Sequence, residues 1–297
     1  MNLANLLIDA ADNAPDAPAL ARGTEVTADF AAHARRSARI AGALRNELGL
    51  APGDRVALLM QNDPSYSEIM FGIWQAGCAA VPINARLHSR EAAWILENCG
   101  ARICFTDSDQ IENLSAALEN GNSPDKILAV GSSDYEDLLN AAALPVTDVN
   151  EDDLAWLFYT SGTTGRPKGA MLSHRNLRAM NRAYLASVDE INPGDSIIHA
   201  APMSHGSGLY LLPHVERRAV QVIPESGGFD LEEFPLLLER WSGITMFMAP
   251  TMVTRLVNRV EADGLDAGSI KSIIYGGAPM YLEDCLRSLD ILGNKLI

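Results

Sequence analysis

Short apolar runs, separated by segments with helical periodicity, recur along most of this 297-residue chain. Runs of this length and composition are typical of buried strands. They fall at residues 55–60, 79–83, 102–106, 126–130, 154–158, 196–200, 220–223, 245–248 and 272–275. A single helix between consecutive strands favours right-handed crossovers and parallel pairing. The pattern therefore predicts an α/β fold with a mostly parallel sheet.

The segments between these runs are predicted to be helices. Pro64 stands at an allowed N-terminal position of a helix that ends near residue 75. Ser89 is predicted to cap a helix to residue 98, and Ser173 to cap one that ends near residue 188. The first 50 residues are also expected to be helical, because apolar residues recur at helical spacing near both ends of that segment.

The stretch from residue 159 to residue 169 has a composition that cannot pack a core. It reads Tyr-Thr-Ser-Gly-Thr-Thr-Gly-Arg-Pro-Lys-Gly and follows the apolar run at 154–158. Hydroxyls, glycines and cations suit a loop whose backbone N–H groups and hydroxyls bind a phosphate. It is not a Walker loop, because Lys168 is preceded by Pro167 and followed by Gly169. The alternative is a flexible linker, although a linker needs neither a strand before it nor a Pro-Lys pair inside it.

This stretch resembles, at every position, the signature loop of the adenylate-forming superfamily. That superfamily comprises acyl- and aryl-CoA ligases, adenylation domains of peptide synthetases, and luciferases. The resemblance implies that the loop closes over the β- and γ-phosphates of ATP, with a hydroxyl of Thr160 on the Mg²⁺ side and Lys168 balancing charge. The other residues implied to contact the phosphates are Ser161, Gly162, Thr163, Thr164 and Gly165.

A second segment, residues 201–208, reads Ala-Pro-Met-Ser-His-Gly-Ser-Gly and resembles a further motif of the superfamily. The resemblance implies that His205 stands at the carboxylate pocket, and it assigns Gly206 to substrate binding as well. Ser204 replaces the aromatic residue that is usual there, which leaves that part of the pocket wall open. A loop histidine that only faces solvent is the alternative.

Two more segments match the superfamily in order along the chain. Residues 275–279 resemble its adenine-binding segment, although an ordinary strand-to-helix turn also explains the two glycines. Residues 249–251 correspond to a segment that lines the acyl pocket, although helix capping explains Pro250 equally well. The residues implied to bind nucleotide are Gly276, Gly277, Ala278 and Pro279, and those implied to bind the acid are Ala249, Thr251 and Gly277.

Composition excludes several functional classes. An apolar fraction of 47% with 21% charged residues is typical of a soluble globular protein. The net charge of −15 disfavours binding to nucleic acids or anionic membranes. No stretch approaches the ~18 apolar residues of a membrane span, and no signal peptide is indicated, so the cytoplasm is the expected location. The four cysteines are expected to be free thiols, and the histidines other than His205 are expected to be structural.

The resemblance implies an acid–thiol ligase. It would activate a small-molecule carboxylic acid with ATP to an acyl adenylate and then form a thioester with coenzyme A, as in fatty acid metabolism. ATP, Mg²⁺ and coenzyme A are the implied cofactors. The implied fold is two stacked, mostly parallel sheets, in subdomains of about 54–200 and of about 1–50 plus 201–297.

The superfamily pattern continues beyond the motifs found here, into a C-terminal domain. Residues 1–297 are therefore expected to be an N-terminal adenylation-domain fragment that does not turn over alone and could form a homodimer. Two alternatives stay open: an adenylation domain that loads a carrier protein, and a non-catalytic nucleotide-binding or interaction module. The sequence does not identify the acid.

Overall fold

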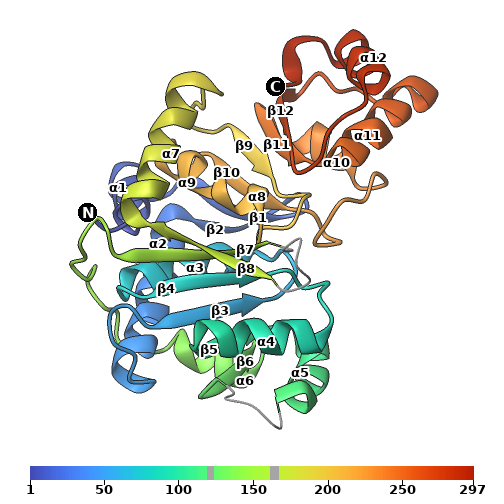
Figure 1. Ribbon diagram of the computed structural model, residues 1–297. Helices are drawn as coiled ribbons and strands as arrows, with labels where there is room; N and C mark the ends of the chain where they lie inside the picture. Colours follow the sequence, from blue (N-terminus) through green and yellow to red (C-terminus); the bar gives the residue numbers. More distant parts are fainter. Residues whose placement is uncertain (119–123, 161–166) are drawn as a thin grey trace. The chain divides into compact units, whose positions relative to one another are not determined.

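The computed structural model describes residues 1–118, 124–160 and 167–297 (Figure 1). The chain divides into two compact units. The first unit comprises Met1–Ile8, Ala32–Gln61 and Ser65–Met180, and the second comprises Asp9–Ala31, Asn62–Pro64 and Asn181–Ile297. Residues 32–50 thus group with the first unit and residues 181–200 with the second, whereas the expected subdomains placed both segments the other way.

The sheet of the first unit has the strand order β6-β5-β3-β4-β7-β8. All neighbours are parallel except β7 and β8, which are antiparallel. The strands are β3 Arg55–Leu59, β4 Ala79–Ile83, β5 Ala101–Thr106, β6 Lys126–Ala129, β7 Leu154–Thr160 and β8 Lys168–Ser173. Every strand predicted in this region is present, which confirms the mostly parallel α/β prediction.

Helices cover both faces of this sheet. The helices that lie wholly or mostly in the unit are α2 Phe30–Gly42 with a π-helical extension Ala43–Glu47, α3 Pro64–Gln75, α4 Ser89–Cys99, α5 Ile111–Leu118 after a 3₁₀ turn Ser108–Gln110, and α6 Ser133–Leu138. One face packs against α4 and α5 through residues such as Leu96 and Leu114. On α3, the Trp74 indole N–H donates to the Ala155 carbonyl of β7 at 2.9 Å. This contact anchors the strand that leads to the signature loop.

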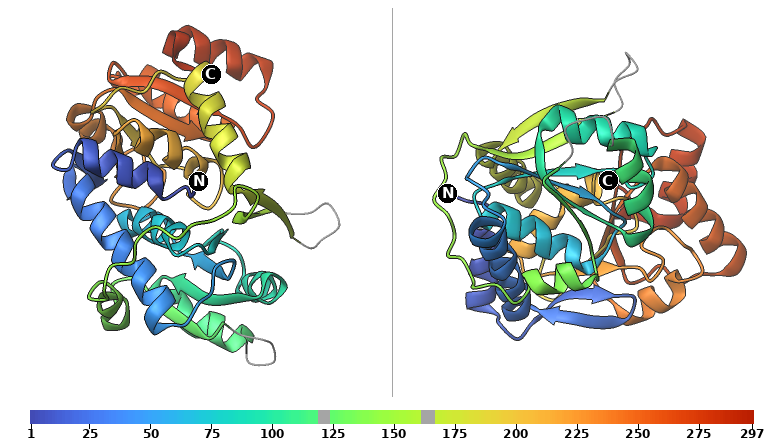
Figure 2. Two further views of the ribbon diagram at one scale, coloured as in Figure 1. Left: turned by 90° about the vertical axis from the view of Figure 1, so that its left-hand side faces the viewer. Right: turned by 90° about the horizontal axis from the view of Figure 1, so that it is seen from below.

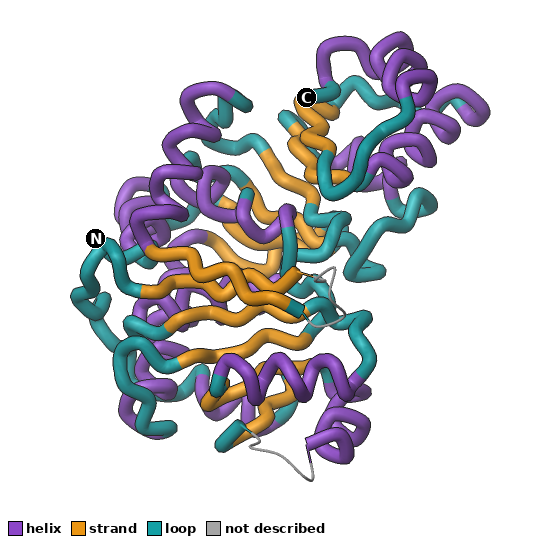
Figure 3. Tube along the Cα trace, viewed as in Figure 1, coloured by secondary structure: helices purple, strands orange, loops and turns teal. Residues whose placement is uncertain are grey.

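The sheet of the second unit has the order β12-β11-β9-β10-β1-β2, in which only β2 is antiparallel. Figure 3 draws strands in orange and helices in purple. The strands are β1 Pro18–Arg22, β2 Glu25–Asp29, β9 Ser196–Ile198, β10 Val220–Ile223, β11 Ile244–Met248 and β12 Ile270–Tyr275. The helices are α8 Gly206–Leu209, α9 Leu211–Glu216, α10 Phe234–Arg240, α11 Pro250–Asp263 and α12 Leu282–Leu292 with a 3₁₀ turn Gly293–Lys295. A boundary between the units falls inside α1 Asn5–Asn13 and inside α7 His174–Ser187.

The core of the second unit is continuous along its parallel strands. Helices α10 and α11 contribute Phe234, Leu237 and Leu256 to a cluster that also contains Met246 of β11 and Ile273 of β12. Burial of such side chains stabilises each by about 1.5–3 kcal/mol. The core thereby holds β9, β11 and β12 in register, and these are the strands that precede three of the predicted site segments.

The expectation that the first 50 residues are helical is wrong for residues 18–29. These residues form the hairpin of β1 and β2, with a turn at Gly23 and Thr24. Gly23 has a φ of 55°, which glycine adopts at little cost. Strand β1 gains its other partner, β10, from about 200 residues further along the chain, and local periodicity carries no information about such a partner.

One smaller prediction also needs correction, and one further strand was not predicted. His88, not Ser89, is the N-cap of α4, and its side chain accepts a hydrogen bond from the Arg90 N–H. Residues 168–173 form strand β8, which was not predicted. In the part of the chain that the structure describes, no helix has the length and apolarity needed to cross a bilayer.

Candidate active site

The signature loop connects the two strands of a β-hairpin in the first unit. Strands β7 and β8 run antiparallel (Figure 2), and Thr160 pairs with Lys168 across the base of the loop. Both residues are exposed. The structure therefore brings together the predicted Mg²⁺-side hydroxyl and the predicted loop cation. The predicted contacts Ser161, Gly162, Thr163, Thr164 and Gly165 lie outside the described residues.

The last buried residue before the loop is Tyr159. Its hydroxyl donates to the Asn98 side-chain oxygen at 2.6 Å, and its ring meets Trp94 edge-on with centroids 6.5 Å apart. Burial raises the pKa of Tyr159 to about 12, so the phenol stays protonated and keeps donating. A Cβ on the facing residue, Gly169, would lie 3.0 Å from the Tyr159 ring. The pair thus closes the base of the hairpin tightly.

Three predicted segments meet at one edge of the sheet in the second unit. Strands β12, β11 and β9 are parallel neighbours, and residues 276–279, 249–251 and 201–208 follow their carboxyl ends. Ligands of open α/β sheets bind at this edge. The structure therefore places the following predicted residues at the carboxyl ends of neighbouring strands of one sheet: His205, Gly206, Ala249, Thr251, Gly276, Gly277, Ala278 and Pro279.

Phe247 of β11 lies between two of these segments. A Cβ on Gly206 would be 2.5 Å from Phe247 Cε1, and a Cβ on Gly276 would be 3.2 Å from Phe247 Cε2. The Phe247 ring also packs edge-on against Tyr210, with centroids 5.6 Å apart. A side chain at residue 206 would force this aromatic ring to shift, because the ring fills the space that the side chain would need.

His205 is half-buried at the start of α8. Its Nδ1 lies 2.9 Å from the Ser204 hydroxyl oxygen, and its backbone N–H donates to the Pro202 carbonyl at 3.1 Å. Burial lowers the pKa of His205 below its usual value, which favours a neutral imidazole at neutral pH. The residue can therefore take part in hydrogen bonds to an acid without carrying a fixed charge.

Residues 249–251 begin helix α11. Ala249 is its N-cap and Pro250 occupies its first turn. The start of the helix therefore explains Pro250, which was the alternative to a role in the acyl pocket. Ala249 is half-buried and Thr251 is exposed. Gly277 has a φ of 87°, in the region that favours glycine, and Gly277, Ala278 and Pro279 are all exposed.

Four histidines outside these segments are buried, and each has a structural partner. The partners are Ser67 for His33, Leu3 for His174, Ser207 and Gln221 for His199, and Tyr210 for His214. Among the described residues, no three His, Cys, Asp or Glu side chains come together as a metal site. The four cysteines are free thiols, as expected.

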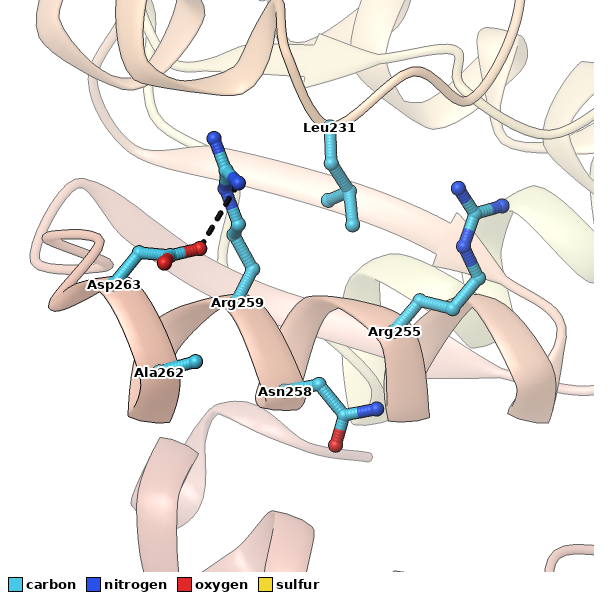
Figure 4. A pocket seen from close by; sticks show the side chains of 6 residues that line it. All are labelled: Leu231, Arg255, Asn258, Arg259, Ala262 and Asp263. Carbon is cyan, nitrogen blue, oxygen red and sulfur yellow. Dashed lines mark ion pairs between the residues drawn. The ribbon is translucent and has the colours of Figure 1, made fainter.

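A separate groove with a volume of about 310 Å³ lies between α11 and Leu231 (Figure 4). Arg259 pairs there with Asp263 at 2.9 Å and with Glu232 at 3.3 Å, and Arg255 stacks over the Phe229 ring. The lining residues are Leu231, Arg255, Asn258, Arg259, Ala262 and Asp263. None of the residues predicted from sequence lines this groove, so we do not assign it to the active site.

Three residues that support the site were not predicted. The sequence offered one indication that Phe247 could be part of the site, because Phe247 is an aromatic residue near the carboxyl end of an apolar strand. Asn98 and Asn62 carried none, because each is a single amide whose partners lie about 60 to 140 residues away.

Comparison with known proteins identifies the family. Residues 7–297 match the model of the AMP-binding enzyme family. The chain is 34% identical over 272 residues to feruloyl-CoA synthase of an Amycolatopsis species, which covers 90% of this chain and 52% of that protein. It is 29% identical over 236 residues to a long-chain-fatty-acid–CoA ligase of Mycobacterium tuberculosis, which covers 78% and 46%. The chain spans about half the length of these relatives.

Solved structures agree with this match. An inhibitor-bound N-terminal domain of FACL13 from Mycobacterium tuberculosis superposes with a TM-score of 0.85 at 26% identity, over 97% of this chain and 73% of that one. ATP-bound MatB from Rhodopseudomonas palustris superposes with a TM-score of 0.81 at 25% identity, over 100% and 59%. The chain therefore belongs to the AMP-binding enzyme family, with the fold of the N-terminal domain of an adenylate-forming enzyme and with acyl-CoA ligases among its relatives.

Proposed function

We propose that this chain supplies the nucleotide-binding and acid-binding residues of an ATP-dependent acyl-CoA ligase. The observation that carries the proposal is the family match over residues 7–297, in a chain whose signature loop is flanked by the paired residues Thr160 and Lys168. The relatives are about twice as long as the chain. We therefore expect residues 1–297 alone to bind nucleotide without turning over.

The proposed reaction has two steps. A carboxylate oxygen attacks the α-phosphorus of ATP, the bond from that phosphorus to the β-phosphate oxygen breaks, and pyrophosphate leaves. The thiolate sulfur of coenzyme A then attacks the acyl carbon, and AMP leaves. Two anions must meet in the first step, so positioning and charge neutralisation supply most of the catalysis.

Each predicted site residue that the structure describes has a role in this proposal. Lys168 neutralises phosphate charge at the base of the loop, and residues 276–279 contact the adenine. His205 contacts the carboxylate as a neutral imidazole. The Ser204 hydroxyl lies 2.9 Å from Nδ1 and helps to orient the ring. Ala249, Gly206 and Thr251 border the acyl group.

Mg²⁺ fits this site as a companion of ATP. Mg²⁺ usually keeps several waters and binds through substrate phosphates and few protein ligands. The exposed Thr160 hydroxyl can provide one ligand, and the described residues hold no acidic cluster that would bind the ion without nucleotide. When bound, the ion would withdraw charge from the phosphate oxygens.

A second candidate acceptor is a carrier protein. The chain is 32% identical over 269 residues to a fatty acid–[acyl-carrier-protein] ligase of Streptomyces coeruleorubidus. The same first step then ends with transfer to the carrier thiol. Pyrophosphate exchange by the full-length gene product, with ferulate or palmitate and with or without coenzyme A, separates the two acceptors. Acid-dependent exchange without thioester formation on coenzyme A would favour the carrier.

The role of the loop is tested by Lys168→Ala, with Lys126→Ala as the matched control. Both lysines begin an outer strand of the same sheet, and Lys126 pairs with Asp134 at 3.0 Å. Loss of a charge-assisted contact to phosphate should weaken ATP binding about tenfold in Lys168→Ala. The control should bind ATP like the wild type in isothermal titration calorimetry. Equal ATP affinity in all three proteins would remove Lys168 from the site.

A further inference from the structure

The segment that carries His205 is held by one buried side chain from a distant part of the sequence. Asn62 lies between β3 and α3 and is 6% exposed. Its Nδ2 donates to the carbonyl oxygens of His199 at 2.7 Å and Ala201 at 2.9 Å. The Met203 N–H donates to Asn62 Oδ1 at 2.8 Å. One amide thus contacts three alternate residues of a single turn.

These three contacts use the complementary donor and acceptor sites of a carboxamide. The two Nδ2 hydrogens each have a carbonyl partner, and Oδ1 has an N–H partner. Aspartate has the same shape but brings an oxygen to the position that faces the two carbonyls. Alanine leaves the backbone groups buried without a partner, which is costly. Both replacements are therefore expected to weaken the hydrogen bonds that hold residues 199–203.

The turn that Asn62 contacts, residues 199–203, lies just before His205 in the chain. The His205 N–H closes onto the Pro202 carbonyl at 3.1 Å, and Pro202 lies between two of the residues that Asn62 contacts. The following residue, Gly206, is pressed against Phe247. The position of His205 is therefore restricted on both sides, by the Asn62 contacts to residues 199–203 before it and by the Phe247 ring beside Gly206 after it.

His199 adds a second support within the same unit. Its Nε2 lies 3.1 Å from Gln221 Oε1, and Gln221 Nε2 in turn donates to the Ala219 carbonyl at 2.9 Å. Because Gln221 Oε1 can only accept, the His199 proton resides on Nε2, and Nδ1 accepts from the Ser207 hydroxyl at 2.8 Å. Ser207 belongs to α8, so His199 holds the helix that follows His205.

We propose that Asn62 is a positioning residue for the carboxylate-binding turn, setting the place of His205 through the backbone of residues 199–203. This rests on the proposed function, in which His205 contacts the acid. If Asn62 had only a structural role, its replacement would lower stability but would not raise KM for the acid more than KM for ATP. A positioning role weakens the acid contact first, because the hydrogen bonds of Asn62 to His199, Ala201 and Met203 hold the segment that leads to His205.

The test is steady-state kinetics of Asn62→Ala and Asn62→Asp in the full-length gene product, with ferulate and palmitate as the acids. The control is Thr245→Val, which removes a part-buried hydrogen bond of the second unit, from Thr245 to Asp189 at 2.7 Å. We expect KM for the acid to rise roughly tenfold in both Asn62 variants with KM for ATP unchanged. Thr245→Val should leave both constants at the wild-type value.

The other outcomes decide against the proposal. Equal increases in both KM values, or unchanged acid KM, would make Asn62 a general structural residue. Failure of both variants to fold, seen as loss of the near-UV circular dichroism signal, would make Asn62 a determinant of the fold instead. A wild-type protein that activates neither acid would count against the proposed substrates and function, and is distinguished because it needs no variant.

Discussion

At the scale of single residues, the site depends on glycines that make room for an aromatic ring. Phe247 occupies the space in which a Gly206 side chain would stand, and it also borders Gly276. The ring is partly exposed and packs on Tyr210. Any side chain at residue 206 must therefore displace a ring that is already supported on another side.

Gly206→Ala is expected to lower the free energy of unfolding by about 1 kcal/mol, because overpacking of 1–3 kcal/mol outweighs the gain of up to about 1 kcal/mol from helix propensity. In a Phe247→Ala background the same change should be neutral or stabilising. Urea unfolding measures both effects. Gly228→Ala serves as the control, since no atom lies within 4 Å of its added Cβ. Additive effects in the double variant would contradict the clash.

At the scale of elements, the hairpin of β7 and β8 delivers the signature loop. It is the antiparallel end of an otherwise parallel sheet, and β8 is an edge strand with exposed residues. Tyr159 ties this hairpin to α4 through Asn98. The base of the loop is thereby set by the packed part of the unit and does not depend on the edge strand alone.

Tyr159→Phe should reduce the free energy of unfolding by about 1 kcal/mol, because it removes the donor to Asn98 and keeps the ring over Gly169. The corresponding change at Tyr281, which is 83% exposed, should have no effect. Thermal unfolding of the two variants side by side provides the measurement. A Tyr159→Phe protein as stable as the wild type would show that the hydrogen bond to Asn98 contributes nothing.

At the scale of the whole molecule, each unit contains two buried neutral histidines. Burial lowers the pKa of His33 and His214 to about 3, and that of His174 and His199 to about 4. The unfolded chain binds these protons near pH 6.5. Folding therefore excludes protons, and the stability that these groups contribute is complete above pH 6.5 and is lost as the pH falls from there toward 4.

Between pH 7.5 and pH 5 we expect each buried histidine to cost on the order of 1–2 kcal/mol of stability. Urea midpoints at the two pH values measure the sum. His33→Gln should make the loss smaller, whereas His88→Asn, which replaces an exposed histidine with another good N-cap residue, should leave it unchanged. A midpoint that is constant over this range would contradict the assignment.

Most strands and helices could be predicted from the sequence, because central strands of a parallel sheet are buried on both faces and read as continuous apolar runs. The two antiparallel edge strands could not. Strands β2 and β8 are largely exposed, so their sequences show no apolar run. The antiparallel pairing of Thr160 with Lys168 was missed for the same reason, although both residues had been singled out.

The sequence by itself determined the α/β class and the chemistry of residues 159–169, since apolar runs and a loop rich in hydroxyls and glycine are local properties of the chain. Only the tertiary structure decided which side chains meet. Asn62 reaches residues 199–203, and Phe247 lies against Gly206 and Gly276. Such contacts depend on the order in which strands pair, and strand order is set by packing between segments far apart in the chain.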